Sequence, residues 1–147
     1  MDKRYSVLMS VYKKERPEYL HAALKSMTGQ SWRPSEIVLV CDGPLTTELE
    51  AVLEDIEFQG LLKTVRLEQN AGLGAALAKG LPECSCEWVA RMDSDDISCP
   101  DRCQKQLHAF SVHNVEIISG IVEEFESMPG DCARRRLVPE QPEEIIR

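Results

Sequence analysis

The chain has 147 residues, 43% of them hydrophobic, which is enough for one compact domain with a continuous core but not for two full domains. Its 25 acidic residues outnumber its 17 basic ones, and the formal net charge is −8. That charge would repel a polyanion, so we expect no nucleic-acid partner, whereas a small phosphate-bearing ligand can still bind an acidic site through a cation.

No segment is typical of a targeting signal or a membrane span. The N-terminal apolar run over residues 7–11 is too short for the core of a signal peptide, and no stretch approaches the roughly 20 apolar residues of a membrane helix. The six cysteines lack paired zinc-ribbon spacing, which favours free thiols over a structural zinc. We therefore expect a cytoplasmic protein, and the sequence leaves its oligomeric state open.

The first half of the chain predicts two strands that alternate with two helices. Apolar runs at 5–12 and 37–41 indicate buried strands, and the second run ends in the turn pair Asp42-Gly43. Between them, Pro17 opens a helix that Gly29 ends. Thr47 and Glu50 then have the spacing of a capping box, which predicts a helix that extends through Ile56.

The second half continues the alternation. It predicts strands at 62–67, 88–92 and 115–122, and helices over 72–81 and from Pro100 onward. Residues 127–147 lack any core-forming periodicity. The side chains that we expect these two helices to bury are Leu73, Ala76, Leu77 and Leu81, followed by Cys103, Leu107 and Phe110.

Strands that alternate with helices predict an α/β fold, a three-layer α/β/α sandwich with a mostly parallel sheet. Ligands of such sheets bind beyond the carboxyl ends of the strands. We therefore expect one edge of the sheet to gather the polar residues that follow the strands, which are Tyr12, Glu15, Asp42, Asn70 and Asp93 to Asp96.

The acidic segment at Asp93, Asp95 and Asp96 is the sharpest local feature. Three carboxylates within four residues are costly without a cation, and their hard oxygens suit Mg²⁺ or Mn²⁺. Asp93 and Asp95 would face the same way if the extended strand geometry continued through them. An acidic loop capping the helix at Pro100 is the alternative, but the position after a strand favours ligand binding.

Three other polar residues are open to two interpretations each. Asp42 can accept hydrogen bonds from a nucleobase or a ribose hydroxyl, although Asp-Gly is also an ordinary turn pair, and residue type alone favours the turn. Asn70, followed by Gly72 and Gly74, suits close approach of the backbone to phosphate or simply a tight turn. Arg91 can pair with a diphosphate or with a neighbouring carboxylate.

Four segments in order resemble family 2 glycosyltransferases over residues 5–126. They are YSVLMSVYKKE, the strand ending in Asp42-Gly43-Pro44, the segment from Asn70 to Gly80, and ARMDSDDISCPDR. The resemblance is to bacterial enzymes that assemble exopolysaccharide or O-antigen repeat units. It implies the nucleotide-diphospho-sugar transferase (Rossmann-like) fold, with a nucleotide-binding half followed by an acceptor-binding half.

The resemblance also implies a donor site that binds a nucleoside-diphosphate sugar through Mn²⁺ or Mg²⁺, with UDP as the default nucleotide and GDP and dTDP left open. Asp93 and Asp95 would be the catalytic acidic pair, Asp93 towards the ribose and Asp95 on the metal, in an inverting transfer. The residues implied around the nucleotide are Val11, Tyr12 and Glu15 at the base and ribose, Asp42 at the base, and Asn70 and Arg91 near the ribose and diphosphate.

One part of the family pattern is missing, since no match to its general base precedes Arg147. We expect residues 1–126 to be a nucleotide-sugar-binding domain and 127–147 the start of a truncated acceptor-binding half, with donor binding retained and transfer weak or absent. The acceptor would be a saccharide or a lipid-linked saccharide, through which the full-length enzyme would associate with the membrane.

Two other functions remain open. A nucleotidyltransferase on a related fold would also use a metal, but its usual glycine-rich loop is absent after the first predicted strand. A non-catalytic binding domain would keep the fold and use the run Arg134 to Arg136 for a partner.

Overall fold

A computed structural model describes residues 4–55, 58, 60–113, 115–131 and 134–137. The chain divides into two compact units, residues 1–107 and 108–147. The predicted functional boundary at residue 126 stays a prediction.

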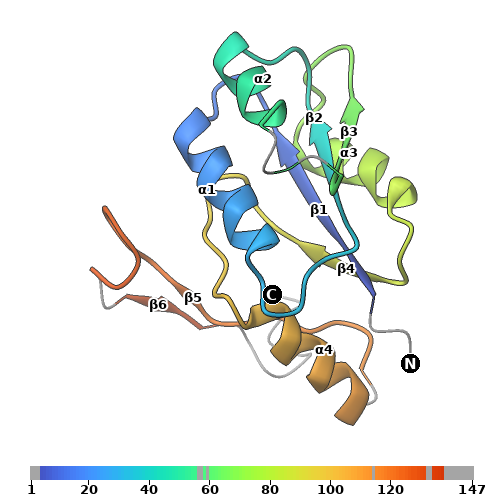
Figure 1. The fold of residues 1–147 in the computed structure, drawn as a ribbon, viewed down its shortest axis with the longest axis vertical. Helices are drawn as coiled ribbons and strands as arrows, with labels where there is room; N and C mark the ends of the chain where they lie inside the picture. The colour runs from blue at the N-terminus through green and yellow to red at the C-terminus, as the bar shows by residue number, and fades with distance from the viewer. Residues whose placement is uncertain (1–3, 56–57, 59, 114, 132–133, 138–147) are drawn as a thin grey trace. The chain divides into compact units, whose positions relative to one another are not determined.

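The first unit is built on a four-stranded sheet (Figure 1). Its strands are β1 (Tyr5–Val11), β2 (Glu36–Cys41), β3 (Leu62–Arg66) and β4 (Trp88–Arg91). The order is β3-β2-β1-β4 and every neighbouring pair is parallel. The carboxyl ends of all four strands therefore lie at the same edge of the sheet.

Helices cover both faces of this sheet. Helices α1 (Pro17–Thr28) and α2 (Thr47–Leu53) lie on one face and α3 (Leu73–Gly80), which continues into the short η2 (Leu81–Glu83), lies on the other (Figure 1). Helix α4 (Arg102–Val112) follows β4 and buries Cys103 in the core of the first unit. The predicted three-layer α/β/α sandwich is confirmed.

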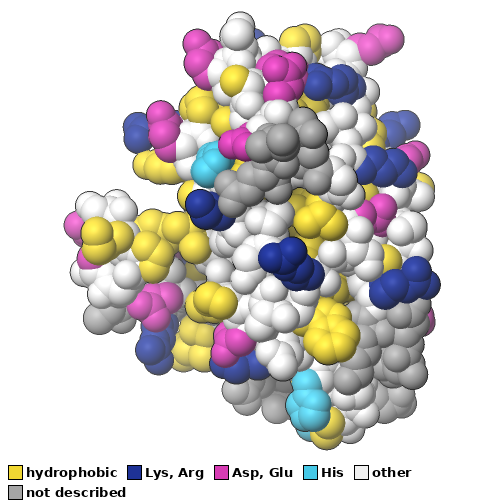
Figure 2. All heavy atoms as spheres, viewed as in Figure 1, with side chains coloured by type: hydrophobic (Ala, Val, Ile, Leu, Met, Phe, Trp, Pro, Cys, Tyr) yellow, Lys and Arg dark blue, Asp and Glu magenta, His cyan; other side chains and the backbone are white. Residues whose placement is uncertain are grey.

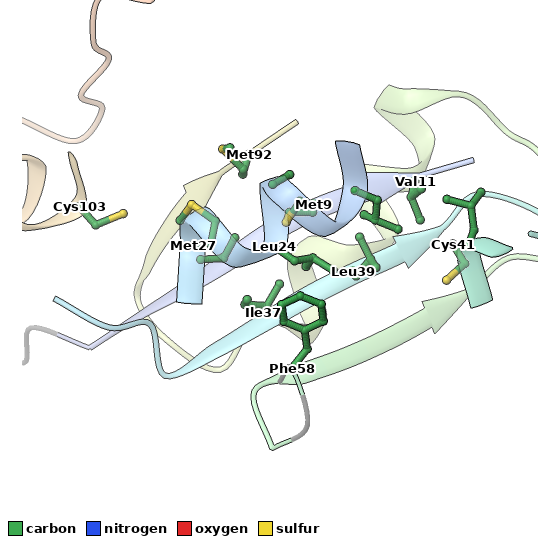
Figure 3. Packing of buried hydrophobic residues seen from close by; sticks show 14 of the residues in the cluster. Met9, Val11, Leu24, Met27, Ile37, Leu39, Cys41, Phe58, Met92 and Cys103 are labelled. Atoms are coloured by element: carbon green, nitrogen blue, oxygen red, sulfur yellow. The ribbon is translucent and has the colours of Figure 1, made fainter. Parts of the chain in front are cut away.

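The alternation of side chains in β1 and β2 divides the core between the two faces. On the α1 face, Met9 pairs in register with Leu39 and Val11 with Cys41, and Phe58 packs into the same cluster (Figure 3). A smaller cluster of Leu8, Val38, Val40 and Ala76 fills the α3 face. Burial on both faces explains why these strands are continuous apolar runs rather than alternating ones.

The predicted N-cap of α2 is wrong by one residue. The cap is Thr46, whose hydroxyl accepts a hydrogen bond from Leu49 N at 3.3 Å. Three residues after this cap stands Leu49 instead of a glutamate, so the predicted capping box of Thr47 and Glu50 does not form. Two successive threonines offer the same chemistry, and only the backbone geometry selects between them. Ile56, the predicted end, lies outside the described residues.

Two of the leucines that we expected α3 to bury are exposed, Leu73 to 51% and Leu81 to 52%. The helix instead presents its small residues, Ala76 and Gly80, to the sheet. A Cβ at Gly80 would lie 2.5 Å from Val40 Cγ2 and 2.7 Å from Leu8 Cδ1. The helix lies too close to the sheet for a large residue at that point, so its terminal leucines face away.

The predicted fifth strand over 115–122 is also wrong. In the described part of the second unit, the strands are β5 (Val122–Glu123) and β6 (Arg135–Arg136), which pair antiparallel. Ile117 is 88% exposed. A run of β-branched residues forms a strand where a partner and a covering layer exist, and the described part of this unit supplies neither to 115–121. Helix α4 begins at Arg102 rather than Pro100, and Phe110 is half-buried.

On the described part of the face that Figure 2 shows, basic and acidic side chains are interspersed with exposed apolar ones. The negative net charge is thus not gathered there into a single patch. No helix in the described part of the chain has the length and apolar character needed to cross a bilayer.

We predict that Gly80→Ala lowers the free energy of unfolding by about 1–3 kcal/mol, because the added methyl group overpacks the α3 face. Gly74→Ala in the same helix is the matched control, since a Cβ added there would meet nothing within 4 Å, and it should be neutral or slightly stabilising. Urea denaturation of both variants measures the difference. Equal stability of the two variants would contradict the close packing at Gly80.

Candidate functional site

The loop after β1 brings Tyr12 and Glu15 to the carboxyl edge of the sheet. Glu15 N donates to Tyr12 O at 3.0 Å, which closes a turn, and Tyr12 is 43% exposed. One oxygen of the Glu15 carboxylate accepts from Arg16 N at 2.8 Å, and the other accepts from the Ser94 hydroxyl. The carboxylate therefore ties this loop to the acidic segment after β4.

Asp42, at the end of β2, is buried and holds the loop between β3 and α3. Its carboxylate accepts hydrogen bonds from Asn70 Nδ2 at 2.9 Å, Ala71 N at 2.7 Å and Gly72 N at 3.0 Å. Next to it, Gly43 has a φ of +87°, and a Cβ there would lie 2.8 Å from Asn70 N. The two loops approach each other so closely that a glycine is required between them.

Through these hydrogen bonds Asp42 stabilises a turn, which is the role that its residue type alone favours. Both of its carboxylate oxygens have partners in the protein, so the expected contact with a base stays a prediction and would have to share an oxygen already bonded. The side chain of Val11 is 1% exposed and belongs to the core. Its main-chain carbonyl accepts a hydrogen bond from Asp42 N at 2.8 Å, and its implied place at the nucleotide stays a prediction.

The acidic segment leaves the sheet directly after β4. Met92 and Ser94 are buried, Asp93 is half-buried, and Asp95 and Asp96 are exposed. The chain turns at Ser94 and Asp95, so the extended geometry ends at β4 and strand alternation does not set the directions of Asp93 and Asp95. The turn, and not the strand, presents the carboxylates to the solvent.

Negative charge is concentrated at this acidic turn, residues 93–96. Arg91, which is exposed, forms an ion pair with Asp93. Within the described residues, no ion pair neutralises Asp95 or Asp96. The pKa of Asp96 is raised by its partial burial and then by the neighbouring carboxylates of Asp95 and Asp93, against the opposing effect of nearby arginines. A cation would relieve this repulsion.

The donor set fits a hard divalent cation that a substrate helps to bind. The described residues contain no group of three or more His, Cys, Asp or Glu side chains arranged to hold a metal. Mg²⁺ and similar ions are commonly held by one or two carboxylates together with substrate phosphates. In a site of that type Asp95, two residues after Asp93, would supply part of the coordination, and the remaining ligands would come from phosphate and water.

Arg102, at the start of α4, braces the end of β4, and the sequence pattern gives it no role. Its guanidinium donates to Arg91 O at 2.9 Å and contacts Met92 Sδ at 3.4 Å. In the sequence it stands only as part of the segment ARMDSDDISCPDR. Because the loop between β4 and α4 separates it from its partners, no local signal could have indicated this contact.

The family model described as glycosyl transferase family 2 matches residues 6–146 of the chain. A UDP-Gal:alpha-D-GlcNAc-diphosphoundecaprenol beta-1,3-galactosyltransferase of Escherichia coli is 39% identical over 137 residues, 92% of this chain and 50% of that protein. An amylovoran biosynthesis glycosyltransferase of Erwinia amylovora is 45% identical over 116 residues, 79% of this chain and 44% of that protein. The chain spans about half the length of the curated relatives it matches.

The crystal structure of residues 1–349 of S. aureus TarS in complex with UDP-GlcNAc is similar, with a TM-score of 0.67 and 25% identity. The similarity covers 93% of this chain and 37% of that one. The fold implied by the sequence resemblance, that of nucleotide-diphospho-sugar transferases, is confirmed.

We predict that Asp42→Asn lowers the free energy of unfolding by about 1–3 kcal/mol, because an amide turns N–H groups towards the N–H donors that the carboxylate now accepts. Asp101→Asn is the control, since the Asp101 carboxylate is half-exposed and forms a surface ion pair with Lys105, and its effect should stay within about 0.5 kcal/mol. Thermal or urea denaturation tests both. A neutral Asp42→Asn would show that the carboxylate does not hold the loop.

Proposed function

We propose that this chain, which belongs to glycosyl transferase family 2, forms the donor-binding part of an inverting glycosyltransferase. It binds a nucleoside-diphosphate sugar, with UDP as the nucleotide, through Mn²⁺ or Mg²⁺ at the acidic turn. The whole protein transfers the sugar to a saccharide or lipid-linked saccharide acceptor in bacterial polysaccharide biosynthesis.

The acidic turn at the carboxyl edge of the parallel sheet is the observation that carries this proposal. Three carboxylates crowd into four residues, two of them are exposed without an ion pair in the described part of the chain, and the pKa of Asp96 is raised. A site with excess negative charge at this edge favours a cation that in turn attracts a diphosphate.

We assign to the predicted site residues other than the buried Val11 the roles that the family resemblance implies. Asp95, exposed on the turn, binds the metal, and Asp93 lies towards the ribose with Arg91 beside it. Arg91 is free to exchange part of its bond with Asp93 for one to the diphosphate, because both side chains are partly exposed. The remaining residues frame the nucleotide: Tyr12 and Glu15 on the loop after β1, and Asn70 with Asp42 on the loops after β3 and β2.

Inverting transfer needs the acceptor hydroxyl oxygen to attack the anomeric carbon while the bond from that carbon to the diphosphate breaks. A bound metal would supply Lewis-acid stabilisation of the charge on the departing nucleoside diphosphate. The chain's own residues orient the donor, with Asp93 towards the ribose and Asp95 and Arg91 at the diphosphate end. The base that takes the hydroxyl proton is expected outside residues 1–147, in the acceptor-binding half.

The names of the relatives support the choice of donor and acceptor. The Escherichia coli relative is named for UDP-Gal and for an undecaprenol-linked acceptor, and the TarS structure contains UDP-GlcNAc. The Erwinia amylovora relative is named for the biosynthesis of a polysaccharide, amylovoran. We place the protein in the cytoplasm, with association to the membrane through a lipid-linked acceptor.

Calorimetric titration of UDP into the protein, with and without Mn²⁺, tests the donor site. We predict binding that depends on Mn²⁺ and that weakens at least about tenfold, equivalent to about 1.4 kcal/mol, in Asp95→Ala. Asp101→Ala is the matched control, because it removes a nearby acidic residue that pairs with Lys105, and it should bind like the wild type.

Three outcomes separate the proposal from its alternatives. Preference for GDP or dTDP over UDP would keep the donor site and correct the nucleotide. Release of pyrophosphate from a nucleoside triphosphate when a sugar phosphate is supplied to accept the nucleotidyl group would indicate a nucleotidyltransferase. A folded wild type that binds none of the three diphosphates with either metal would overturn the proposal in favour of a non-catalytic binding domain.

A further inference from the structure

Gln30, in the loop between α1 and β2, is a buried amide with every polar atom bonded. It is 3% exposed. Its Nε2 donates to Ser26 O at 3.0 Å, Ser98 Oγ at 3.3 Å and Cys99 O at 2.7 Å, and its Oε1 accepts from Cys103 N at 3.0 Å. Three of these four partners belong to one segment, Ser98 to Cys103, about 70 residues away in sequence.

Two serines next to Gln30 hold the same segment. Ser98 N donates to Ser26 Oγ at 3.0 Å, and Ser31 N donates to Pro100 O at 2.8 Å. The Ser31 hydroxyl donates to Gln104 Oε1 at 2.8 Å. The carboxyl end of α1 and the loop after it therefore bind the backbone of residues 98–103 at several consecutive points, with the Gln30 amide at the centre.

The held segment begins two residues after the acidic turn and has no regular structure until α4. The turn is fixed on its other side by Met92 N, which donates to Leu8 O at 3.0 Å, and by the bond between Ser94 and Glu15. Asp95 and Asp96 are themselves exposed, so packing of their side chains does not place them. Their positions follow from the backbone on both sides of the turn.

We infer that Gln30 is a positioning residue of the donor site, which fixes the backbone after the acidic turn and thereby the direction in which Asp95 and Asp96 face. This inference rests on the proposed function for its consequence in metal and nucleotide binding. A cation held by one or two protein carboxylates depends on their exact placement, because no further protein ligands compensate for a displaced one.

The Gln30→Met variant removes all four hydrogen bonds at nearly constant side-chain length, and Gln30→Glu keeps the acceptor for Cys103 N while losing the amide donors. Both are compared with Gly80→Ala, whose added methyl group meets the side chains of Val40 and Leu8 on the α3 face of the sheet and touches none of the partners of Gln30. This control separates a local effect of Gln30 from a general loss of stability.

We expect Mn²⁺-dependent affinity for UDP, measured by calorimetry at a temperature where all variants are folded, to fall at least about tenfold in Gln30→Met. Gln30→Glu turns a carboxylate oxygen towards the carbonyls of Ser26 and Cys99 and should lose at least as much, whereas Gly80→Ala should bind within about twofold of the wild type. Amide hydrogen exchange of the ligand-free protein should rise over residues 93–103 in the Gln30 variants, with β1 and β2 unchanged. If Gln30→Met does not fold, Gln30→Glu decides the question.

Wild-type affinity in folded Gln30 variants, or a loss as large in Gly80→Ala, would overturn the positioning role. If the wild type itself does not bind UDP with Mn²⁺, the proposed function fails, and exchange then decides the inference separately. Faster exchange confined to residues 93–103 would still show that Gln30 positions the turn. Unchanged exchange there would overturn it.

Discussion

The site depends on the pairing of β1 with a parallel strand on each side. Val11, the last residue of β1, is in register with Cys41, the last of β2, but Arg91, the last of β4, is in register with Leu8. The chain therefore leaves β4 three residues before β1 ends, a step of about 10 Å. Because of this step, the acidic turn lies beside the end of β1. There Glu15, in the loop after β1, accepts a hydrogen bond from Ser94.

Aspartates that follow two strands of the same sheet have opposite roles because their surroundings differ. Asp42 is buried, and backbone N–H groups and an amide satisfy its charge, so it organises the protein itself. Asp95 and Asp96 face the solvent with no ion pair in the described residues, so their charge is available to a ligand. Position after a strand could not separate these roles, since Asp42 and the acidic turn both follow one, and only the Asp42-Gly43 pair favoured a turn at Asp42.

Sequence periodicity was sufficient to predict β1 and β2, the parallel sheet and the edge where the polar residues gather, because strands buried on both faces are continuous apolar runs. It failed where tertiary contacts decide the result. The close approach of α3 to the sheet exposes Leu73, and the described residues offer no partner to the run that contains Ile117. The role of Gln30 could not be predicted, because a glutamine after a helix gives no local sign that its partners lie about 70 residues away.

A metal-assisted donor site needs carboxylates that are charged and that are also fixed in position. Exposed carboxylates meet both requirements when the buried Gln30 amide fixes the neighbouring backbone. Burying Asp95 and Asp96 would fix their positions but would raise the cost of their negative charge further, as the raised pKa of Asp96 already indicates. Leaving them in water avoids that cost but gives their side chains no packing. Gln30 is neutral and all of its polar atoms are hydrogen-bonded, so it can order the backbone of the turn without burying a charge. The turn is then ordered before a ligand arrives, which reduces the entropy lost on binding.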